Sequence, residues 1–200
     1  MNHLNIENYY TGLCNSPSDI NEHLPLLRSL SLDCESITEM GVRWVVSTFA
    51  FVTALPKKLT CIDLFHPEHF GNEAKNRINL IEEYCKINNI NFSLTIDDTL
   101  SIDIEETDLL FIDTLHSYYQ CKEELKKHGN KAKKYIVLHD TTLFGSNDDG
   151  GMMSSHPERY HPTKHGLNIA ITEFLEENKN WAIKEVKTNN NGLTILQRLM

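Results

Sequence analysis

The chain has 200 residues, which is enough for one sizeable domain with a single hydrophobic core. Its formal net charge of -9 argues against a nucleic-acid partner, because a protein that binds a phosphate backbone needs a basic stripe. No apolar run approaches the ~20 residues of a membrane helix, so we also expect no membrane partner.

The five cysteines are odd in number, scattered, and form no Cys-x-x-Cys pair. They are Cys14, Cys34, Cys61, Cys85 and Cys121. This pattern fits reduced thiols better than a disulfide framework or a zinc site. The first residues also lack the basic region and apolar core of a signal peptide. We therefore expect a cytoplasmic protein.

The first part of the chain, residues 1–35, is expected to form an arm and a helix that precede the main domain, residues 36–200. Residues 1–17 are polar and without clear periodicity, which predicts an irregular arm. Residues 21–32 are predicted to be a helix, because leucines recur along one side and a serine–aspartate pair precedes it as a cap.

From residue 36 onward, apolar strands alternate with helical stretches. Strands are predicted at 36–40, 59–64, 92–96, 109–112 and 135–138, and helices at 44–54, 73–86, 118–127 and 169–175. Residues 181–187 and 193–199 are two closing strands, joined by an Asn/Gly run that is typical of a hairpin. This order predicts an α/β fold with a doubly wound parallel sheet and one late antiparallel strand.

A long segment without periodicity, residues 142–164, follows the fifth predicted strand. A loop of this length is more often a functional lid than a plain connector. It carries Phe144 and three histidines, His156, His161 and His165, whose spacing matches no tight metal site. We interpret the segment as a mobile cover over a binding site.

Two neighbouring apolar strands each lead into an acid and an imidazole. The run 109–112 is followed by Asp113 and His116, and the run 135–138 by His139 and Asp140. Because ligands bind outside the carboxyl ends of the strands in an open α/β sheet, we expect these side chains to form a site. A regular strand would point His139 to the opposite face, so we rank it below His116.

The first strand ends in a turn that suits an anionic group. Glu39 and Gly41 lie at the strand end and Ser47 opens the next helix, whose free backbone N–H groups favour a carboxylate or phosphate. Arg43 and a valine two residues later stand where a dinucleotide loop has further glycines, and Arg43 could supply a direct charge. Asp63 ends the next strand, where an acid can hydrogen-bond a ribose. A plain strand–helix turn would explain the same residues.

Together these motifs resemble class I S-adenosylmethionine-dependent methyltransferases, of the small stand-alone O-methyltransferase type found among glycan and natural-product genes. The resemblance runs from about residue 37 to 198 and rests on the words EMGVRWVVST, CIDLF, DDTL, DLLFIDTLHSYYQCKEEL, YIVLHDTTLFG, GLNIAITEFLEEN and NNNGLTIL. It implies a Rossmann-like, doubly wound seven-stranded sheet, mostly parallel with the last strand antiparallel.

The resemblance also implies a site for S-adenosylmethionine (SAM), shared among the first three strand ends. Its methionine part would lie near Glu39, Gly41 and Ser47, with Arg43 on the same loop. Its ribose would be held by Asp63, and its adenine would be flanked by Asp98 and Thr99.

Catechol-type and sugar O-methyltransferases of this superfamily hold a divalent metal beside the acceptor hydroxyl, on the acids that end the fourth and fifth strands. Here those acids are Asp113 and Asp140, and Thr141 stands where relatives have Asn or Asp. Oxygen ligands of this kind suit Mg²⁺ or Mn²⁺, and a bound metal lowers the cost of ionising a hydroxyl. His116 would be the general base, since an imidazole accepts a proton at neutral pH.

The implied function is a SAM-dependent O-methyltransferase that acts on a hydroxyl of a sugar, a glycan or a related small molecule, with Asp113 and His116 as catalytic residues. Whether it forms a homodimer stays open. Asp113 could instead only cap the following helix, His116 could be a solvated surface residue, and the two could act as acid and base without metal. The main alternative function is a catalytically degenerate methyltransferase-fold binding module, which the missing glycines favour. A nicotinamide-dependent oxidoreductase is disfavoured by the same glycine-poor turn.

Overall fold

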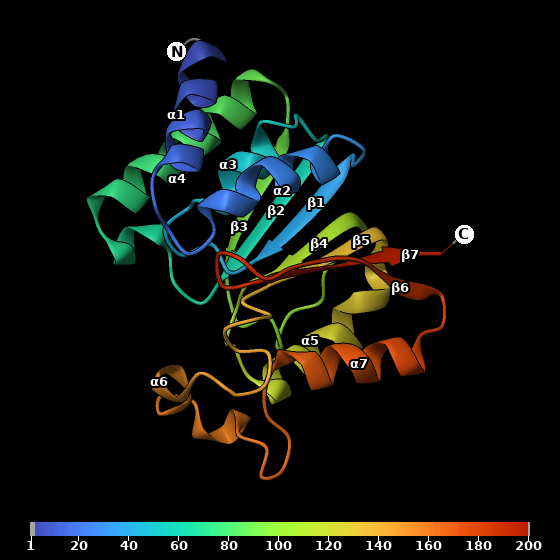
Figure 1. The fold of residues 1–200 in the computed structure, drawn as a ribbon. Coiled ribbons are helices and arrows are strands. Elements are labelled where there is room, and N and C mark those ends of the chain that lie inside the picture. The colour runs from blue at the N-terminus through green and yellow to red at the C-terminus, as the bar shows by residue number, and fades with distance from the viewer. Residues whose placement is uncertain (1–2, 200) are drawn as a thin grey trace.

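The computed structural model describes residues 3–199 and contains a seven-stranded sheet between two layers of helices (Figure 1). The strands are β1 (Ser36–Met40), β2 (Lys58–Asp63), β3 (Asn91–Ile96), β4 (Thr107–Ile112), β5 (Ala132–His139), β6 (Trp181–Lys187) and β7 (Leu193–Arg198). Their order in the sheet is β3-β2-β1-β4-β5-β7-β6. The first five strands pair in parallel, and β7 runs antiparallel to both β5 and β6. This confirms the predicted Rossmann-like sheet, with only the last strand antiparallel.

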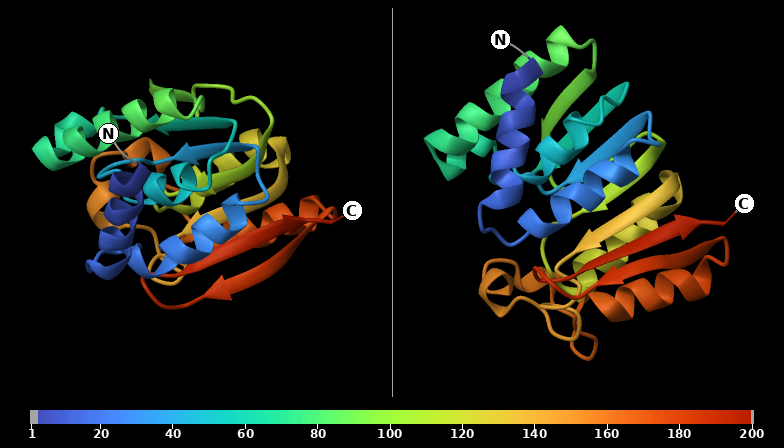
Figure 2. Two further views of the ribbon diagram at one scale, coloured as in Figure 1. Left: turned by 90° about the horizontal axis from the view of Figure 1, so that it is seen from above. Right: turned by 45° about the horizontal axis from the view of Figure 1, so that its top comes forward.

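The helices are α1 (His3–Asn15), α2 (Leu24–Ser31), α3 (Ser47–Val52), α4 (Asn72–Ile87), α5 (Tyr118–His128), α6 (Gly150–Met153) and α7 (Leu167–Glu177). Short 3-10 turns are η1 (Asn21–His23), η2 (Pro67–Phe70), η3 (Gly129–Lys131) and η4 (Pro157–Arg159). Helices α1 to α4 cover one face of the sheet, and α5 and α7 cover the other (Figure 2). No helix among residues 3–199 is long and apolar enough to cross a membrane.

The core follows the alternation of side chains along the central strands. In β4, Leu109 and Phe111 pack with the helices of the first face, and Leu110 and Ile112 pack with α5 and α7. A strand that is buried on both faces reads as a continuous apolar run, which is why β4 and β5 are recognisable in the sequence.

The predicted irregular arm over residues 1–17 is wrong, because most of it is helix α1. Ile6, Tyr10 and Leu13 recur at helical spacing and are buried against the same core as the sheet. The asparagines and other polar residues between them obscure this apolar stripe in the sequence.

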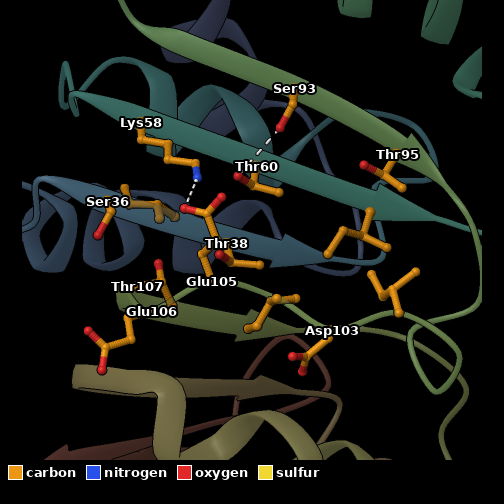
Figure 3. A pocket seen from close by; sticks show the side chains of 14 residues that line it. Ser36, Thr38, Lys58, Thr60, Ser93, Thr95, Asp103, Glu105, Glu106 and Thr107 are labelled. Carbon is orange, nitrogen blue, oxygen red and sulfur yellow. Dashed lines mark hydrogen bonds and ion pairs between the residues drawn. The ribbon is translucent and has the colours of Figure 1, made fainter.

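On the side of α5, the half of the sheet made by β1, β2 and β3 lacks a covering helix. The connection from β3 to β4, residues 97–106, is fully described and contains no helix. A hollow of about 290 Å³ therefore lies over β1, β2 and β3 on the side of α5. Figure 3 shows that its lining is rich in hydroxyls, among them Thr38, Thr60, Ser93 and Thr95. Hydroxyl side chains tolerate contact with water, so this face does not need a helix to bury it.

The order of the strands reverses between β1 and β4, and the chain is tightly packed just beyond them. Gly41 follows β1 with a φ of +87°, and a Cβ atom there would lie 1.9 Å from the carbonyl oxygen of Asp113. Only glycine fits this approach without displacing the backbone. In an open α/β sheet, ligands bind at the point where the strand order reverses. The close contact between Gly41 and Asp113 lies at this point, so we look for the candidate site here.

Candidate active site

A cavity of about 340 Å³ lies at the carboxyl ends of β1, β2, β3 and β4. Its size is within the range of small-molecule sites. It brings together most of the predicted site residues, namely Gly41, Arg43, Ser47, Asp63, Asp98, Thr99, Asp113, His116 and Asp140. Glu39 and Thr141 are the predicted residues that do not line it. The residues predicted for a donor and for catalysis therefore face one common space.

The loop after β1 has a shape that normally requires glycine, but it is built from other residues. Arg43 and Val45 have φ values of 43° and 58°, in the left-handed region, where a β-branched residue is strained. The predicted helix over 44–54 therefore begins only at Ser47. The Arg43 guanidinium lies over the Trp44 ring, 4.0 Å from its centroid, and reaches to 3.8 Å from the Asp19 carboxylate.

Asp63 holds this loop in place. One of its carboxylate oxygens accepts hydrogen bonds from the backbone N–H groups of Val42 and Arg43, at 2.7 and 2.8 Å. The other accepts from the backbone N–H of Phe65, at 3.0 Å. Each carboxylate oxygen has two lone pairs, so the group keeps capacity for a further donor in the cavity, such as a ribose hydroxyl.

Glu39 lies beneath the loop rather than in the cavity. Its side chain is fully buried and accepts hydrogen bonds from the Ser47 and Thr48 hydroxyls and the Cys61 thiol. It therefore anchors the start of α3. Burial raises the pKa of Glu39 to about 7, although the hydrogen bonds from Ser47 and Thr48 act in the opposite direction.

Replacing Glu39 with glutamine should remove a pH dependence of stability. Between its ordinary pKa of 4.5 and about 7, the folded Glu39 holds a proton that the unfolded chain has lost. The free energy of unfolding therefore falls as the pH rises through this window. Glutamine does not titrate, so Glu39→Gln should gain up to about 3 kcal/mol relative to wild type between pH 4.5 and 7.5. Urea denaturation at several pH values measures this, with the exposed Glu83→Gln as control. Parallel pH profiles for wild type and Glu39→Gln would contradict the assignment.

The predicted adenine end is held by residues from three parts of the chain. Asp98 accepts from the backbone N–H of Leu100 at 2.9 Å and from the Arg159 guanidinium. The Thr99 hydroxyl donates to Glu124 at 2.6 Å and accepts from Gln120 at 3.0 Å. Sequence reasoning missed Arg159 and Gln120, because neither lies in a motif and their partners are distant in the chain.

At the other end of the cavity, two carboxylates and two imidazoles alternate. The His116 Nε2 atom lies 3.2 Å from an Asp113 oxygen and 2.9 Å from an Asp140 oxygen. The His139 Nδ1 atom lies 3.4 and 3.3 Å from oxygens of the same two residues. The neighbouring strands β4 and β5 thus deliver an acid–imidazole cluster of Asp113, His116, His139 and Asp140.

The expectation that His139 points away from this site is wrong. The residue after it, Asp140, has a φ of +60°, so the alternation of the strand ends there and the two side chains converge. The His139 ring is fixed by its Nε2 atom, which lies 3.1 Å from the Asp19 carbonyl oxygen and 3.2 Å from that of Asn190. Asp19 also lines the cavity, so the segment before β1 contributes to the site.

The cluster is strongly coupled electrostatically. Burial opposes the charge on His116 and His139, but the contacts with Asp113 and Asp140 outweigh it and raise their pKa values to about 10 and about 11. Burial likewise opposes the charges of the two acids, yet the imidazoles lower the pKa of Asp140 to about 2 and hold that of Asp113 well below its usual range. Both imidazoles are therefore protonated at neutral pH in this arrangement, and the cluster is a set of ion pairs.

Three of these residues also fit a cation site. Ligand atoms of Asp113, His139 and Asp140 all lie within 4.8 Å of one another. Among the described residues, the Asp140 Oδ1 atom is buried without a hydrogen-bond partner, and His139 Nδ1 is buried with only its ion-pair contacts to the two carboxylates, which suits atoms that could ligate an ion. The Thr141 hydroxyl is hydrogen-bonded to that of Thr194, at 2.9 Å. His139 thus offers a ligand atom in addition to the predicted ligands Asp113, Asp140 and Thr141.

No family model matches the chain, and no curated protein matches it. Solved structures do match. TomG, an O-methyltransferase from Streptomyces achromogenes involved in tomaymycin synthesis and solved with SAM, has a TM-score of 0.62 at 16% identity, over 92% of this chain and 82% of that one. An O-methyltransferase from Bacillus cereus in complex with S-adenosylhomocysteine (SAH) has a TM-score of 0.56 at 13% identity, over 98% and 89% of the two chains. Magnesium protoporphyrin IX methyltransferase from Synechocystis PCC 6803 with bound SAH has a TM-score of 0.55 at 12% identity, over 98% and 94%.

The chain therefore has the fold of the class I SAM-dependent methyltransferases. Within that class it matches small O-methyltransferases over most of their length, which confirms the predicted resemblance at the level of the fold.

Proposed function

We propose that this protein is a SAM-dependent O-methyltransferase. The observation that carries the proposal is the common cavity, in which most of the predicted donor residues face the same space as Asp113, His116 and Asp140 of the acid–imidazole cluster. A methyl donor and an acceptor hydroxyl must meet for transfer to occur, so both sets of residues belong in one site.

The charge of the cavity supports this donor. Its lining carries six carboxylates against three cationic groups, which are Arg43, Arg159 and the protonated His116. The carboxylates are those of Asp19, Asp63, Asp97, Asp98, Asp113 and Asp140. An excess of carboxylates favours a ligand that carries positive charge. SAM has a sulfonium and an ammonium group, whereas a nicotinamide dinucleotide brings an anionic pyrophosphate to the turn after β1.

In the proposed reaction, the acceptor oxygen forms a bond to the donor methyl group, the sulfur–carbon bond breaks with its electron pair returning to sulfur, and SAH is released. The acceptor hydroxyl also loses its proton. We assign the removal of that proton to His116, which lines the cavity and is oriented by Asp113 and Asp140. His116 must lose its own proton first, because the two carboxylates keep it protonated in the arrangement seen here.

A divalent metal fits the same cluster once His139 gives up its proton, with Asp113, Asp140 and His139 as the residues that would hold it and Thr141 beside them. When bound, it would lower the cost of ionising the acceptor hydroxyl. Two carboxylates suit Mg²⁺ or Mn²⁺, and the imidazole favours Mn²⁺ of the two. The carboxylate oxygens that would bind this ion are the same ones that raise the pKa values of His116 and His139. The ion and the two protons therefore compete for the same carboxylates.

The acceptor class we propose is a hydroxyl of a sugar, a glycan or a related small molecule. A screen of methyl transfer from SAM to free monosaccharides and short glycosides, with Mn²⁺ present, tests it. We expect transfer to at least one of these acceptors, and its loss in EDTA with recovery on adding Mn²⁺. Full activity in EDTA would exclude the metal and leave the acid and base roles alone. Transfer to none of the hydroxyl acceptors would overturn the proposed acceptor class.

A second candidate is a methyltransferase-fold module that binds without catalysing transfer. The strained residues at the glycine positions of the first loop, Arg43 and Val45, favour it. The buried ion pairs of the acid–imidazole cluster argue against it, because they cost desolvation energy and contribute little to stability. We keep the enzyme as the better candidate.

We further propose a cytoplasmic location, which the five free cysteines support. A small-molecule or glycan acceptor is the expected partner, with no nucleic acid or membrane. Size-exclusion chromatography with light scattering would decide between a monomer and the homodimer that the sequence leaves open.

A further inference from the structure

The predicted cover, residues 142–164, contacts both ends of the cavity. At the catalytic end, the Phe144 ring stacks on the His116 ring, with centroids 4.8 Å apart and planes 6° apart. The backbone N–H of Asp149 donates to the His116 carbonyl oxygen at 2.8 Å, and the Asp149 carboxylate lies 3.8 Å from Nδ1 of the ring. At the donor end, the same segment contributes His156 and Arg159 to the cavity lining. One continuous segment therefore touches the proposed base and the proposed donor site.

Arg159 makes the main polar contact at the donor end. Its side chain is buried, with 9% exposure for the residue. The guanidinium donates to Asp98, just beyond β3, and to the side-chain oxygen of Gln120 in α5. A planar guanidinium that is bonded to two groups fixes the position of both. One of them, Asp98, is the acid predicted to flank the adenine.

Gln120 connects this contact to a buried network. Its amide nitrogen donates to the Thr99 hydroxyl at 3.0 Å and to Glu124 at 2.7 Å. Glu124 also accepts from the hydroxyls of Thr99 and Thr114, at 2.6 and 2.9 Å. Thr114 directly follows Asp113, the acid of the catalytic cluster. The network thus links the cover, the adenine end and the end of β4 through buried hydrogen bonds, whose loss is costly.

We propose that Arg159 is a positioning residue that closes residues 142–164 over the bound methyl donor and so determines how tightly the donor is held. This rests on the proposed function, since SAM must occupy the cavity. Arg159 holds Asp98 where its carboxylate can accept from the exocyclic amine of adenine, and it excludes water from that end. Closure at the donor end also keeps Phe144 and Asp149 against His116, so the donor is covered while the base is oriented.

The test compares Arg159→Ala with wild type by titration with SAH, by steady-state kinetics and by hydrogen exchange of residues 142–164. We expect Arg159→Ala to raise the Kd for SAH and the KM for SAM by about tenfold or more, while kcat at saturating SAM falls by less. SAH should slow exchange in residues 142–164 of wild type, and this protection should be lost in Arg159→Ala. Arg159→Lys keeps the charge without the fork of donors, so it should recover only part of the affinity.

Tyr160→Ala is the matched control, because Tyr160 is the next residue and is 55% exposed. It should bind SAH as wild type does. Circular dichroism and Tm establish that each variant is folded, and Arg159→Gln replaces the alanine variant if that one does not fold. Unchanged or tighter SAH binding in folded Arg159→Ala would overturn the proposal. Hydrogen exchange of residues 142–164 that SAH does not slow in the wild type would also overturn it. A wild type that binds no SAH would instead overturn the proposed function.

Discussion

Replacing Asp113 with asparagine is expected to lower the rate of methyl transfer by about a thousandfold or more. Asp113 contacts both imidazoles of the cluster, at 3.2 Å from His116 and 3.4 Å from His139. Asparagine has nearly the same shape but no charge, so it cannot hold the imidazoles or a cation in the same way. Steady-state kinetics with an acceptor found in the screen measures the loss.

The control for this prediction is Asp103→Asn, which removes an acid near the open sheet face, outside the cavity. It should leave the rate unchanged. SAH affinity of Asp113→Asn should stay within about threefold of wild type, since the donor contacts lie elsewhere. Tm is measured as well, because breaking a buried ion pair destabilises a protein. A folded Asp113→Asn that keeps a tenth of the wild-type rate would remove Asp113 from the catalytic residues.

Replacing Asp63 with alanine is expected to weaken SAH binding by about a hundredfold or more, which corresponds to about 2.7 kcal/mol. The alanine variant loses the predicted contact with the ribose and also the two bonds that hold the backbone of Val42 and Arg43. The loop after β1 then relaxes from its strained conformation and the donor site is lost. Thermal shift and titration calorimetry with SAH measure the effect.

Asp63→Asn separates the two roles of this residue. Its side-chain oxygen can still accept from the loop N–H groups, but it offers one acceptor oxygen instead of two. It should therefore keep the bonds from Val42 and Arg43 but lose the one from Phe65, so we expect a Tm between those of wild type and Asp63→Ala and an intermediate affinity for SAH. Wild-type SAH affinity in the alanine variant would show that the ribose is held by another residue.

The strands and their order follow from local features of the sequence. The run Leu109–Ile112 is apolar because β4 is buried on both faces, and the acid Asp113 follows it directly. The acids at the ends of neighbouring parallel strands must lie at one edge of the sheet, so the sequence alone predicts that Asp113 and Asp140 lie close together.

The parts that could not be predicted depend on single backbone torsions or on long-range contacts. His139 and Asp140 converge because Asp140 adopts a left-handed conformation, although it is not a glycine and nothing in the sequence signals this torsion. Arg159 lies in a segment whose sequence has no periodicity, and its bond to Asp98 joins residues that are distant in the chain. Helix α1 was missed because its apolar stripe is narrow and its other residues are polar. In each case tertiary packing, rather than local preference, determines the outcome.

The central claim is that the cavity at the carboxyl ends of β1 to β4 takes an adenosyl methyl donor. Titration calorimetry of the wild-type protein with SAM, SAH and NAD tests it most directly. We expect both adenosyl compounds to bind at a single site with dissociation constants in the micromolar range, about -8 kcal/mol, and NAD not to bind. If neither SAM nor SAH binds, or if NAD binds in their place, the account is contradicted.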